Sequence, residues 1–142
     1  MQEVSQTKIA IVGSSHLSET EEMDARKYSG LVLNQMIKEN GKDDLLFISG
    51  GAKGVDTIAE EVAKELGIGT EILKPVEQNW DAFKVRNIRI AELCDVLYCF
   101  PTKIKLVPCY HCKFKDHEKT AGCWTMNYAN KLKKETHIVP LT

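Results

Sequence analysis

The sequence has no long hydrophobic run, no surplus of charge of either sign, and no repeated or low-complexity segment. No stretch approaches the ~20 consecutive apolar residues that a membrane-spanning helix requires, so we do not expect an integral membrane protein. The net charge of −1 gives no general attraction to nucleic acid. The apolar run at residues 9–12 is too short for a secretory signal and ends at Gly13, so we expect a cytoplasmic location.

The length and the composition are those of one ordinary globular domain. With 142 residues, 43% hydrophobic and 27% charged, the chain can bury a core, and we expect residues 1–142 to form a single domain. Cytoplasmic thiols stay reduced, so the five cysteines indicate metal binding or burial rather than disulfides. Cys94 and Cys99 lie within apolar patterns, which predicts small core residues.

Strand and helix patterns alternate along the chain. Short apolar runs predict strands at residues 8–13, 45–49, 70–73, 96–100 and 137–141. Helical spacing of apolar residues predicts helices at residues 19–40, 55–66, 83–93 and 121–134. This order predicts an α/β protein, a three-layer, doubly wound parallel sheet of about five strands. Ligands bind such Rossmann-like sheets beyond the carboxyl ends of the strands.

A glycine-rich loop at residues 49–56 joins the second strand to the second helix. Gly50, Gly51 and Gly54 would let the backbone approach a phosphate, and the helix N-terminus supplies free N–H groups. The spacing matches neither the dinucleotide fingerprint nor a P-loop. By itself the loop fits equally well a tight turn whose glycines serve backbone geometry.

Three side chains near the predicted loops have two interpretations each. Arg86 could bind a phosphate bidentately, although a solvated or salt-bridged arginine is commoner. Trp80 could stack on a base, although a half-buried loop tryptophan is commoner. His16 could touch a ligand, although a solvated loop histidine is commoner.

Several segments together resemble one superfamily, the Rossmann-like group that joins the DNA-processing protein A domain to LOG-type proteins ("lonely guy", lysine decarboxylase-like). The resemblance covers residues 8–134 and rests on Gly13-Ser14-Ser15, on residues 50–59 and on Arg86-Asn87 ahead of Cys94-Asp95. It implies a nucleotide or nucleotide-derived phosphate ligand at the carboxyl edge of the sheet. The ligand-binding residues that it implies are Gly13, Ser14, Ser15, Gly50, Gly51, Gly54, Asp56, Arg86, Asn87 and Thr125.

The resemblance also bears on catalysis. LOG-type members cleave the N-glycosidic bond of nucleoside 5′-monophosphates, and their second motif is Pro-Gly-Gly-x-Gly-Thr followed by a catalytic glutamate. Thr125 stands for the motif threonine, but Met126, Asn127 and Tyr128 follow it where the glutamate is expected. Cleavage needs a carboxylate near the departing sugar. We therefore expect binding with little LOG-type hydrolysis, and a nucleotide-processing hydrolase is the alternative.

The segment before the last predicted helix has the spacing of a zinc site. Cys109, Cys112, His117 and Cys123 follow the pattern C-x2-C-x4-H-x5-C, close to a zinc knuckle, and zinc takes four such ligands tetrahedrally. His111 could replace His117. A redox pair or uncoordinated thiols are the alternatives. We expect a zinc-stabilised, zinc-finger-like lid at residues 101–120, with no position left for a catalytic water.

The same insertion is locally basic. Five lysines stand against Asp116 and Glu118, and Tyr110 and Phe114 lie between lysines, so the insertion could bind single-stranded nucleic acid. We prefer a solvated basic loop around a structural metal, because the overall charge gives no support for nucleic acid. Sheets of this class often pair through an amphipathic helix, which leaves a homodimer open.

Overall fold

The computed structural model describes residues 6–102 and 120–141. Five parallel strands form one sheet in the order β3-β2-β1-β4-β5. The strands are β1 (Thr7–Gly13), β2 (Leu45–Ser49), β3 (Gly69–Ile72), β4 (Val96–Phe100) and β5 (Glu135–Ile138). The helices are α1 (Glu19–Asn40), the short 3₁₀ helix η1 (Lys42–Asp44), α2 (Val55–Glu65), α3 (Trp80–Leu93) and α4 (Ala121–Lys131). The predicted parallel α/β class is confirmed.

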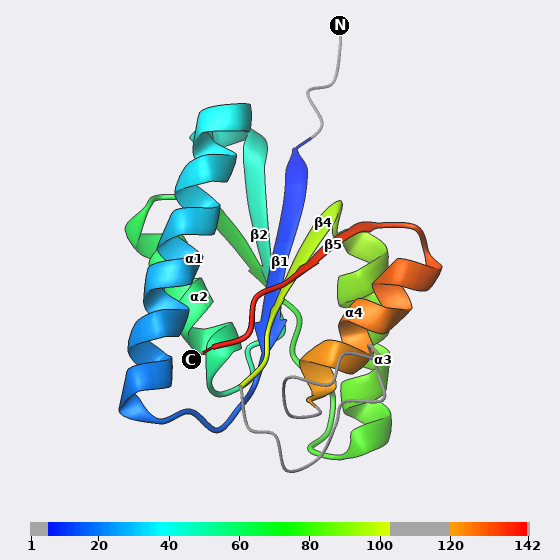
Figure 1. The fold of residues 1–142 in the computed structure, drawn as a ribbon. Coiled ribbons are helices and arrows are strands. Elements are labelled where there is room, and N and C mark those ends of the chain that lie inside the picture. Colours follow the sequence, from blue (N-terminus) through cyan, green and yellow to red (C-terminus); the bar gives the residue numbers. More distant parts are fainter. Residues whose placement is uncertain (1–5, 103–119, 142) are drawn as a thin grey trace, which may run out of the picture.

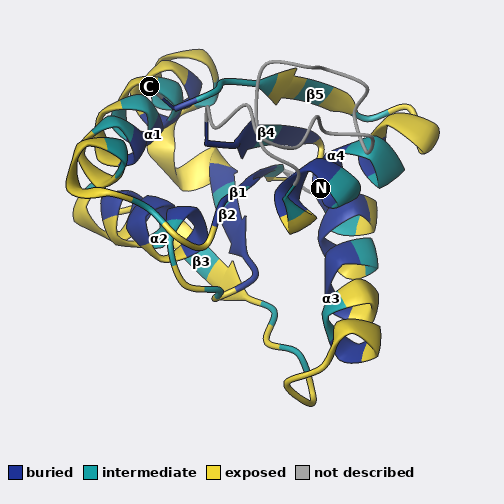
Figure 2. Ribbon diagram, turned by 60° about the horizontal axis from the view of Figure 1, so that its bottom comes forward, coloured by how far each residue is buried: buried dark blue, intermediate teal, exposed yellow. Residues whose placement is uncertain are grey.

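The molecule has three layers, with α1 and α2 on one face of the sheet and α3 and α4 on the other (Figure 1). Alternate residues of a strand point to opposite faces. Ile9 and Ile11 of β1 accordingly pack in the core beside α1 and α2, whereas Ala10 and Val12 pack in the core beside α3 and α4. Both faces of the central strands are covered (Figure 2), so β1 is a continuous apolar run rather than an alternating one.

The carboxyl ends of β1 and β4 lie side by side, because Gly13 pairs with Phe100 in the parallel register. The helix after β1, α1, lies on one face of the sheet, and the helix after β4, α4, lies on the other (Figure 1). This divergence is the point where strand order reverses, and open α/β sheets bind their ligands in the crevice that it creates.

Several element ends differ from the predicted ones. Helix α3 begins three residues early, at Trp80, because the Asn79 side chain caps it by accepting from Ala82 N at 2.9 Å. Arg86 therefore lies inside the helix rather than at its start. Helix α4 ends at Lys131, before Lys133, whose φ of 61° is left-handed and incompatible with a continuing helix.

Strands β3 and β5 are also displaced from the predicted ranges. Strand β3 begins and ends one residue earlier than expected, and β5 covers Glu135–Ile138 instead of 137–141. The residues after β5 still run alongside the end of β4. Val139 N donates to Cys99 O, and Leu141 forms a parallel bridge with Thr102.

Two predictions about the core and the membrane can be checked directly. Cys94 and Cys99 are fully buried, which confirms them as core residues. None of the helices that the structure describes has the length and apolar character needed to cross a membrane.

Candidate functional site

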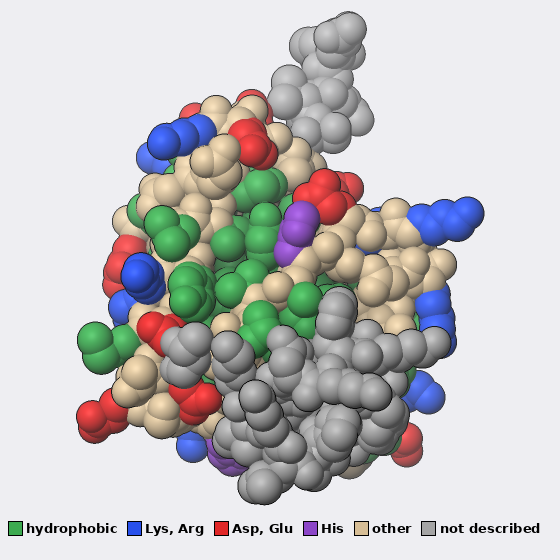
Figure 3. Space-filling model, viewed as in Figure 1, with side chains coloured by type: hydrophobic (Ala, Val, Ile, Leu, Met, Phe, Trp, Pro, Cys, Tyr) green, Lys and Arg blue, Asp and Glu red, His purple; other side chains and the backbone are tan. Residues whose placement is uncertain are grey.

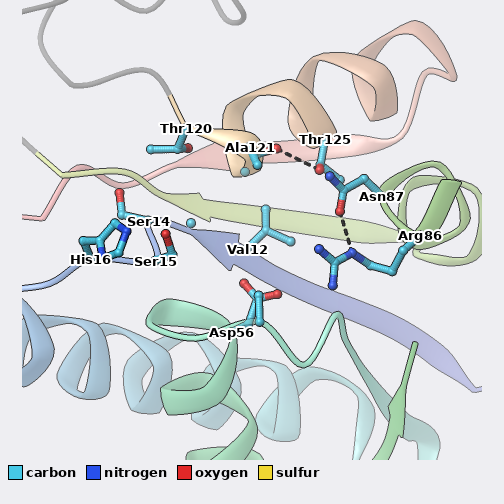
Figure 4. A pocket seen from close by; sticks show the side chains of 13 residues that line it. Val12, Ser14, Ser15, His16, Asp56, Arg86, Asn87, Thr120, Ala121 and Thr125 are labelled. Atoms are coloured by element: carbon cyan, nitrogen blue, oxygen red, sulfur yellow. Dashed lines mark hydrogen bonds between the residues drawn. The ribbon is translucent and has the colours of Figure 1, made fainter. Parts of the chain in front are cut away.

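A cavity of about 280 Å³ lies at the point where strand order reverses (Figure 4). Its volume is near the lower end of small-molecule pockets, roughly 300–1,000 Å³. It is bounded by the end of β1 with the loop after it, the start of α2, the side of α3 and the first turns of α4. The lining residues are Val12, Gly13, Ser14, Ser15, His16, Ala52, Asp56, Arg86, Asn87, Thr120, Ala121, Gly122 and Thr125.

Most of the predicted ligand-binding residues meet at this cavity. Gly13, Ser14, Ser15, Asp56, Arg86, Asn87 and Thr125 line it. Gly50, Gly51 and Gly54 do not. The sequence pointed to Thr125 of α4 but not to Thr120, Ala121 and Gly122 just before it, which also line the cavity. His16, for which solvent was preferred, is exposed and also lines the cavity.

The glycines serve close backbone packing between loops. A Cβ on Gly54 would collide with the Ser14 carbonyl oxygen, and a Cβ on Gly122 would lie 2.7 Å from Gly13 N. The end of β1 and the loop after it are therefore held between the starts of α2 and α4, with no room for a side chain at Gly54 or Gly122. Of the three glycines in the loop before α2, only Gly54 has such close backbone contacts, whereas Gly50 and Gly51 lie against side chains.

Ser14 ties the ends of several elements together. It is 5% exposed, its N–H donates to Phe100 O, its carbonyl accepts from Val55 N, and its Oγ accepts from Thr102 N at 2.9 Å. Buried polar groups are normally satisfied in this way. Ser14 therefore shapes the cavity wall, and its backbone N–H is already used within the protein.

Arg86 and Asn87 bring donors to the cavity. Arg86 is 9% exposed, and it donates through Nε to Asn87 Oδ1 at 2.7 Å and through Nη1 to Gly50 O. Asn87 is 4% exposed, and its Nδ2 has no hydrogen-bond partner among the described residues. A buried donor left unsatisfied costs about 1–3 kcal/mol. A ligand acceptor in the cavity would remove that penalty.

Asp56 is the carboxylic acid of the site. It is 5% exposed at the start of α2 and lines the cavity. Burial raises the pKa of Asp56 to about 7, while the Arg86 charge and the backbone at Ala52 and Gly50 oppose the rise, and Glu60 adds to it. Burial also lowers the pKa of Arg86, against the charge of Asp56.

Two helix N-termini face this region, and they differ in charge. At α2, Val55 N already donates to Ser14 O, and Asp56 lies in the first turn. At α4, Thr120 caps Cys123 N at 3.1 Å and the first turn has no acidic residue. A helix N-terminus attracts anions through its free N–H groups and its dipole. The α4 end is therefore the better anion site, whereas the sequence pointed to the glycine loop before α2.

Of the four predicted zinc ligands, the structure describes only Cys123. Cys109, Cys112 and His117, with the alternative His111, lie outside the described residues. Cys123 is fully buried in the core beside α3 and α4, with its Sγ 3.9 Å from Cys99 Sγ. Within residues 6–102 and 120–141 no three metal-ligating side chains come together. The zinc site stays a prediction from sequence spacing.

An aromatic row connects the starts of α3 and α4. The Trp80 and Trp124 rings meet edge to face with centroids 5.7 Å apart, and Trp124 stacks on Tyr128 with centroids 5.7 Å apart. Trp80 is the first residue of α3 rather than a loop residue, and it is 47% exposed. The sequence could not reveal this row, because only helix packing brings Trp80 beside Trp124.

Comparisons with known proteins place the fold. No family model and no curated protein matches the sequence. DNA processing protein A from Streptococcus pneumoniae is similar in structure, with a TM-score of 0.66 and 20% identity over 98% of this chain and 52% of that chain. The chain thus spans about half the length of that protein.

Two further solved structures are similar. DNA processing protein A from Helicobacter pylori, solved for its single-stranded DNA binding mode, gives a TM-score of 0.65 and 18% identity over 97% of this chain and 67% of that one. The structural genomics target TM1055 gives 0.62 and 17% identity over 92% of this chain and 72% of that one. The chain therefore has the Rossmann-like fold of these proteins, which confirms at the level of fold the resemblance predicted from its sequence.

Proposed function

We propose that this protein binds a nucleotide or nucleotide-derived phosphate in the cavity at the carboxyl edge of the sheet. The main support is the buried pair Arg86 and Asn87 at the cavity wall. The Nδ2 donor of Asn87 has no hydrogen-bond partner among the described residues. The phosphate lies between Arg86 and the first turn of α4, and the sugar and base extend toward the open side near His16.

The chemistry of the cavity wall suits a tetrahedral oxyanion such as a phosphate. Arg86 has five N–H donors, of which two donate to Gly50 and Asn87. A ligand with acceptor atoms could bind the remaining Arg86 donors. It could also bind Asn87 Nδ2 and the N–H groups of Ala121 and Gly122. A phosphate offers several acceptor oxygens in a compact tetrahedral group. Because Arg86 is held by two hydrogen bonds, little further ordering is needed when it binds.

A zinc-stabilised lid belongs to the same proposal. It rests on the spacing of Cys109, Cys112 and His117. The last residue of the insertion region, Thr120, begins the wall of the cavity, so a zinc-binding insertion would connect directly to the ligand site.

Isothermal titration with a panel of nucleoside 5′-monophosphates tests the proposal. Arg86→Gln should weaken binding by about 1.5–3 kcal/mol, because it removes a charged hydrogen bond. Arg89→Gln is the matched control, since Arg89 is exposed on the same helix. Equal affinity in wild type and Arg86→Gln, with both proteins folded by circular dichroism, would contradict the proposal.

A second candidate, binding of single-stranded nucleic acid, is favoured by the distribution of charge. Helices α1 and α2 carry nine acidic and four basic residues, whereas α3, α4 and the turn at residues 132–134 carry two acidic and six basic ones. The net charge of −1 therefore hides a basic layer, and basic side chains dominate the α4 edge in Figure 3.

The aromatic row lies on this basic layer. Trp80 is followed one turn later by Lys84, and Tyr128 is followed by Lys131. Trp80 is exposed and Trp124 and Tyr128 are partly buried. Aromatic rings that reach the surface beside lysines suit stacked bases with a nearby phosphate backbone. The similar protein from Helicobacter pylori was solved for its single-stranded DNA binding mode, which supports testing this class of ligand.

Fluorescence polarisation with a labelled single-stranded thymidine oligonucleotide tests the second candidate. Trp124→Leu should weaken binding about 5- to 100-fold, while Trp124→Phe keeps most of it, because stacking needs a flat ring. Leu31→Ala is the control, since Leu31 is 60% exposed on α1, in the opposite layer. If leucine and phenylalanine at position 124 give the same affinity, the aromatic row is a packing feature.

A further inference from the structure

Asp56 and Arg86 face the same cavity from opposite layers of the molecule. Asp56 comes from the start of α2, Arg86 comes from α3, and Figure 4 shows both directed toward the space beside Val12. A Cβ on Gly50 would lie 2.8 Å from Arg86 Nη1 and 2.9 Å from Asp56 Oδ2, so the two groups flank the same glycine. No ion pair within 4.0 Å joins them in the described part of the chain.

The Arg86 guanidinium and the Asp56 carboxyl therefore share one cavity. Arg86 is anchored to Gly50 and Asn87, and Asp56 is 5% exposed. A ligand anion that approaches Arg86 inside a cavity of about 280 Å³ also approaches Asp56. In a buried site the Coulomb energy between like charges is much larger than in water, so the carboxylate and the anion compete for Arg86.

Within the described part of the chain, few other charged groups face Asp56. Arg86 faces it from α3, Glu60 lies one turn further along α2, and His16 lines the cavity from the loop after β1. Lys53 and Lys74 are exposed on the glycine loop and after β3. No acidic or basic residue lies in the first turn of α4.

We propose that Asp56 makes anion binding in this cavity proton-linked: a ligand phosphate engages Arg86 together with the neutral Asp56 carboxyl and is rejected by the carboxylate. This inference rests on the phosphate-binding function proposed above. The neutral carboxyl donates its O–H to a phosphate oxygen, which adds one donor to a wall already rich in donors. The ionised carboxylate cancels the charge of Arg86.

The direction of the pH dependence follows from the Asp56 pKa of about 7. Below that pH the carboxyl is neutral and anion binding is strong. Above it each bound anion requires uptake of one proton, so affinity falls up to about tenfold for each further pH unit. Asp56→Asn keeps the size and a hydrogen-bond donor without the charge, and it should bind the anion equally well at low and high pH.

Sulfate is the probe, because a phosphate ester itself titrates with a pKa of about 6. Binding is followed by NMR shifts of the Gly122 amide and the Arg86 side chain, at about pH 6 and about pH 8.5. Wild type should bind sulfate at least about tenfold more tightly at the lower pH, and Asp56→Asn should show no such difference. His16→Gln should keep the difference, and Asp81→Asn, an exposed acid on α3, is the charge control.

The outcomes separate this inference from the proposed function. Sulfate binding by wild type with equal affinity at both pH values overturns the proton linkage and leaves phosphate binding intact. Loss of the pH dependence in His16→Gln but not in Asp56→Asn overturns it as well, in favour of the imidazole. A carbon-13 titration that finds the Asp56 carboxyl ionised well below neutral pH in the folded protein also overturns it. Absence of sulfate and nucleotide binding at both pH values contradicts the proposed function itself.

Discussion

Arg86 donates through Nε to the side-chain oxygen of its neighbour Asn87 at 2.7 Å, and both residues are buried on α3. This bond uses the acceptor of the Asn87 amide and turns its Nδ2 donor away from Arg86. The pair therefore presents only donors to the cavity. A ligand that is rich in acceptor atoms, such as a phosphate, matches a wall of this kind.

Asn87→Asp should remove the donor while keeping the support of Arg86. The carboxylate can still accept from Arg86 Nε, so the protein should fold, but it adds a negative charge and loses Nδ2. We expect nucleotide affinity to fall by at least about tenfold, the equivalent of ~1.4 kcal/mol. Calorimetric titration measures this affinity, and Asn34→Asp is the control because Asn34 is an exposed residue of α1. Unchanged affinity in Asn87→Asp would mean that Asn87 is not part of the site.

The burial of Asp56 should appear in the pH dependence of stability. The pKa of Asp56 rises from 3.8 to about 7 on folding, so ionising this carboxyl disfavours the folded state. The penalty is absent below the unfolded pKa, grows between the two values, and is complete above about 7. A tenfold change in the ionisation constant on folding corresponds to ~1.4 kcal/mol.

Urea unfolding of Asp56→Asn and wild type at several pH values gives the measurement. The variant should gain stability relative to wild type as pH rises from about 5 to about 8.5, by a few kcal/mol at most. A constant difference between the two proteins across this range would mean that Asp56 ionises normally in the fold.

Gly122→Ala should destabilise the protein through backbone contact. The added methyl group would lie 2.7 Å from Gly13 N and 2.8 Å from Gly13 Cα, and neither atom belongs to a flexible side chain. We expect a loss of about 1–3 kcal/mol in the free energy of unfolding.

Gly30→Ala is the matched control on another helix. A Cβ at Gly30 in α1 meets nothing within 4 Å, so alanine should stabilise that helix by about 0.5–1 kcal/mol. Thermal unfolding of both variants separates the two effects. Similar changes for both glycines would show that the packing between β1 and α4 does not restrict position 122.

The zinc prediction rests on the spacing of cysteine and histidine residues in the sequence. We expect about one zinc per chain, bound through Cys109, Cys112, His117 and Cys123, measured by X-ray fluorescence on protein never exposed to nickel resin. Cys109→Ser should lose the metal. Cys123→Ser distinguishes a ligand from a core thiol: loss of metal supports the four-ligand set, and loss of stability with metal retained assigns Cys123 to the core beside Cys99. Folded protein without metal would exclude the site.

Little or no LOG-type hydrolysis is expected. The residues after Thr125 offer no carboxylate, because Met126 is buried and Asn127 and Tyr128 cannot supply the charge that an oxocarbenium-like transition state requires. Chromatography of nucleoside monophosphates after incubation would show released base. Turnover on the order of one per second would contradict this expectation, and its loss in Asp56→Asn would identify the carboxyl responsible.

The sequence alone determined the class of the fold and the edge that carries the site. Residues 9–12 and 96–100 are unbroken apolar runs, which is what a strand buried on both faces requires. The alternation of such runs with helical periodicity leaves few arrangements other than a parallel sheet. The loops after strands then mark the ligand edge, and the resemblance to one superfamily added Arg86, Asn87 and Asp56 as ligand-binding residues.

Only the tertiary structure decided which residues pack the backbone and which face the ligand site. Gly54 lies against the backbone of the loop after β1, and Gly122 lies against Gly13 at the end of β1. These contacts join segments far apart in the chain, and local spacing does not encode them. The α4 end became the better anion site because Asp56 occupies the start of α2, whereas α4 has no acid in its first turn. The pKa of Asp56 and the missing partner of Asn87 Nδ2 depend on burial, which arises only when both helical layers close on the sheet.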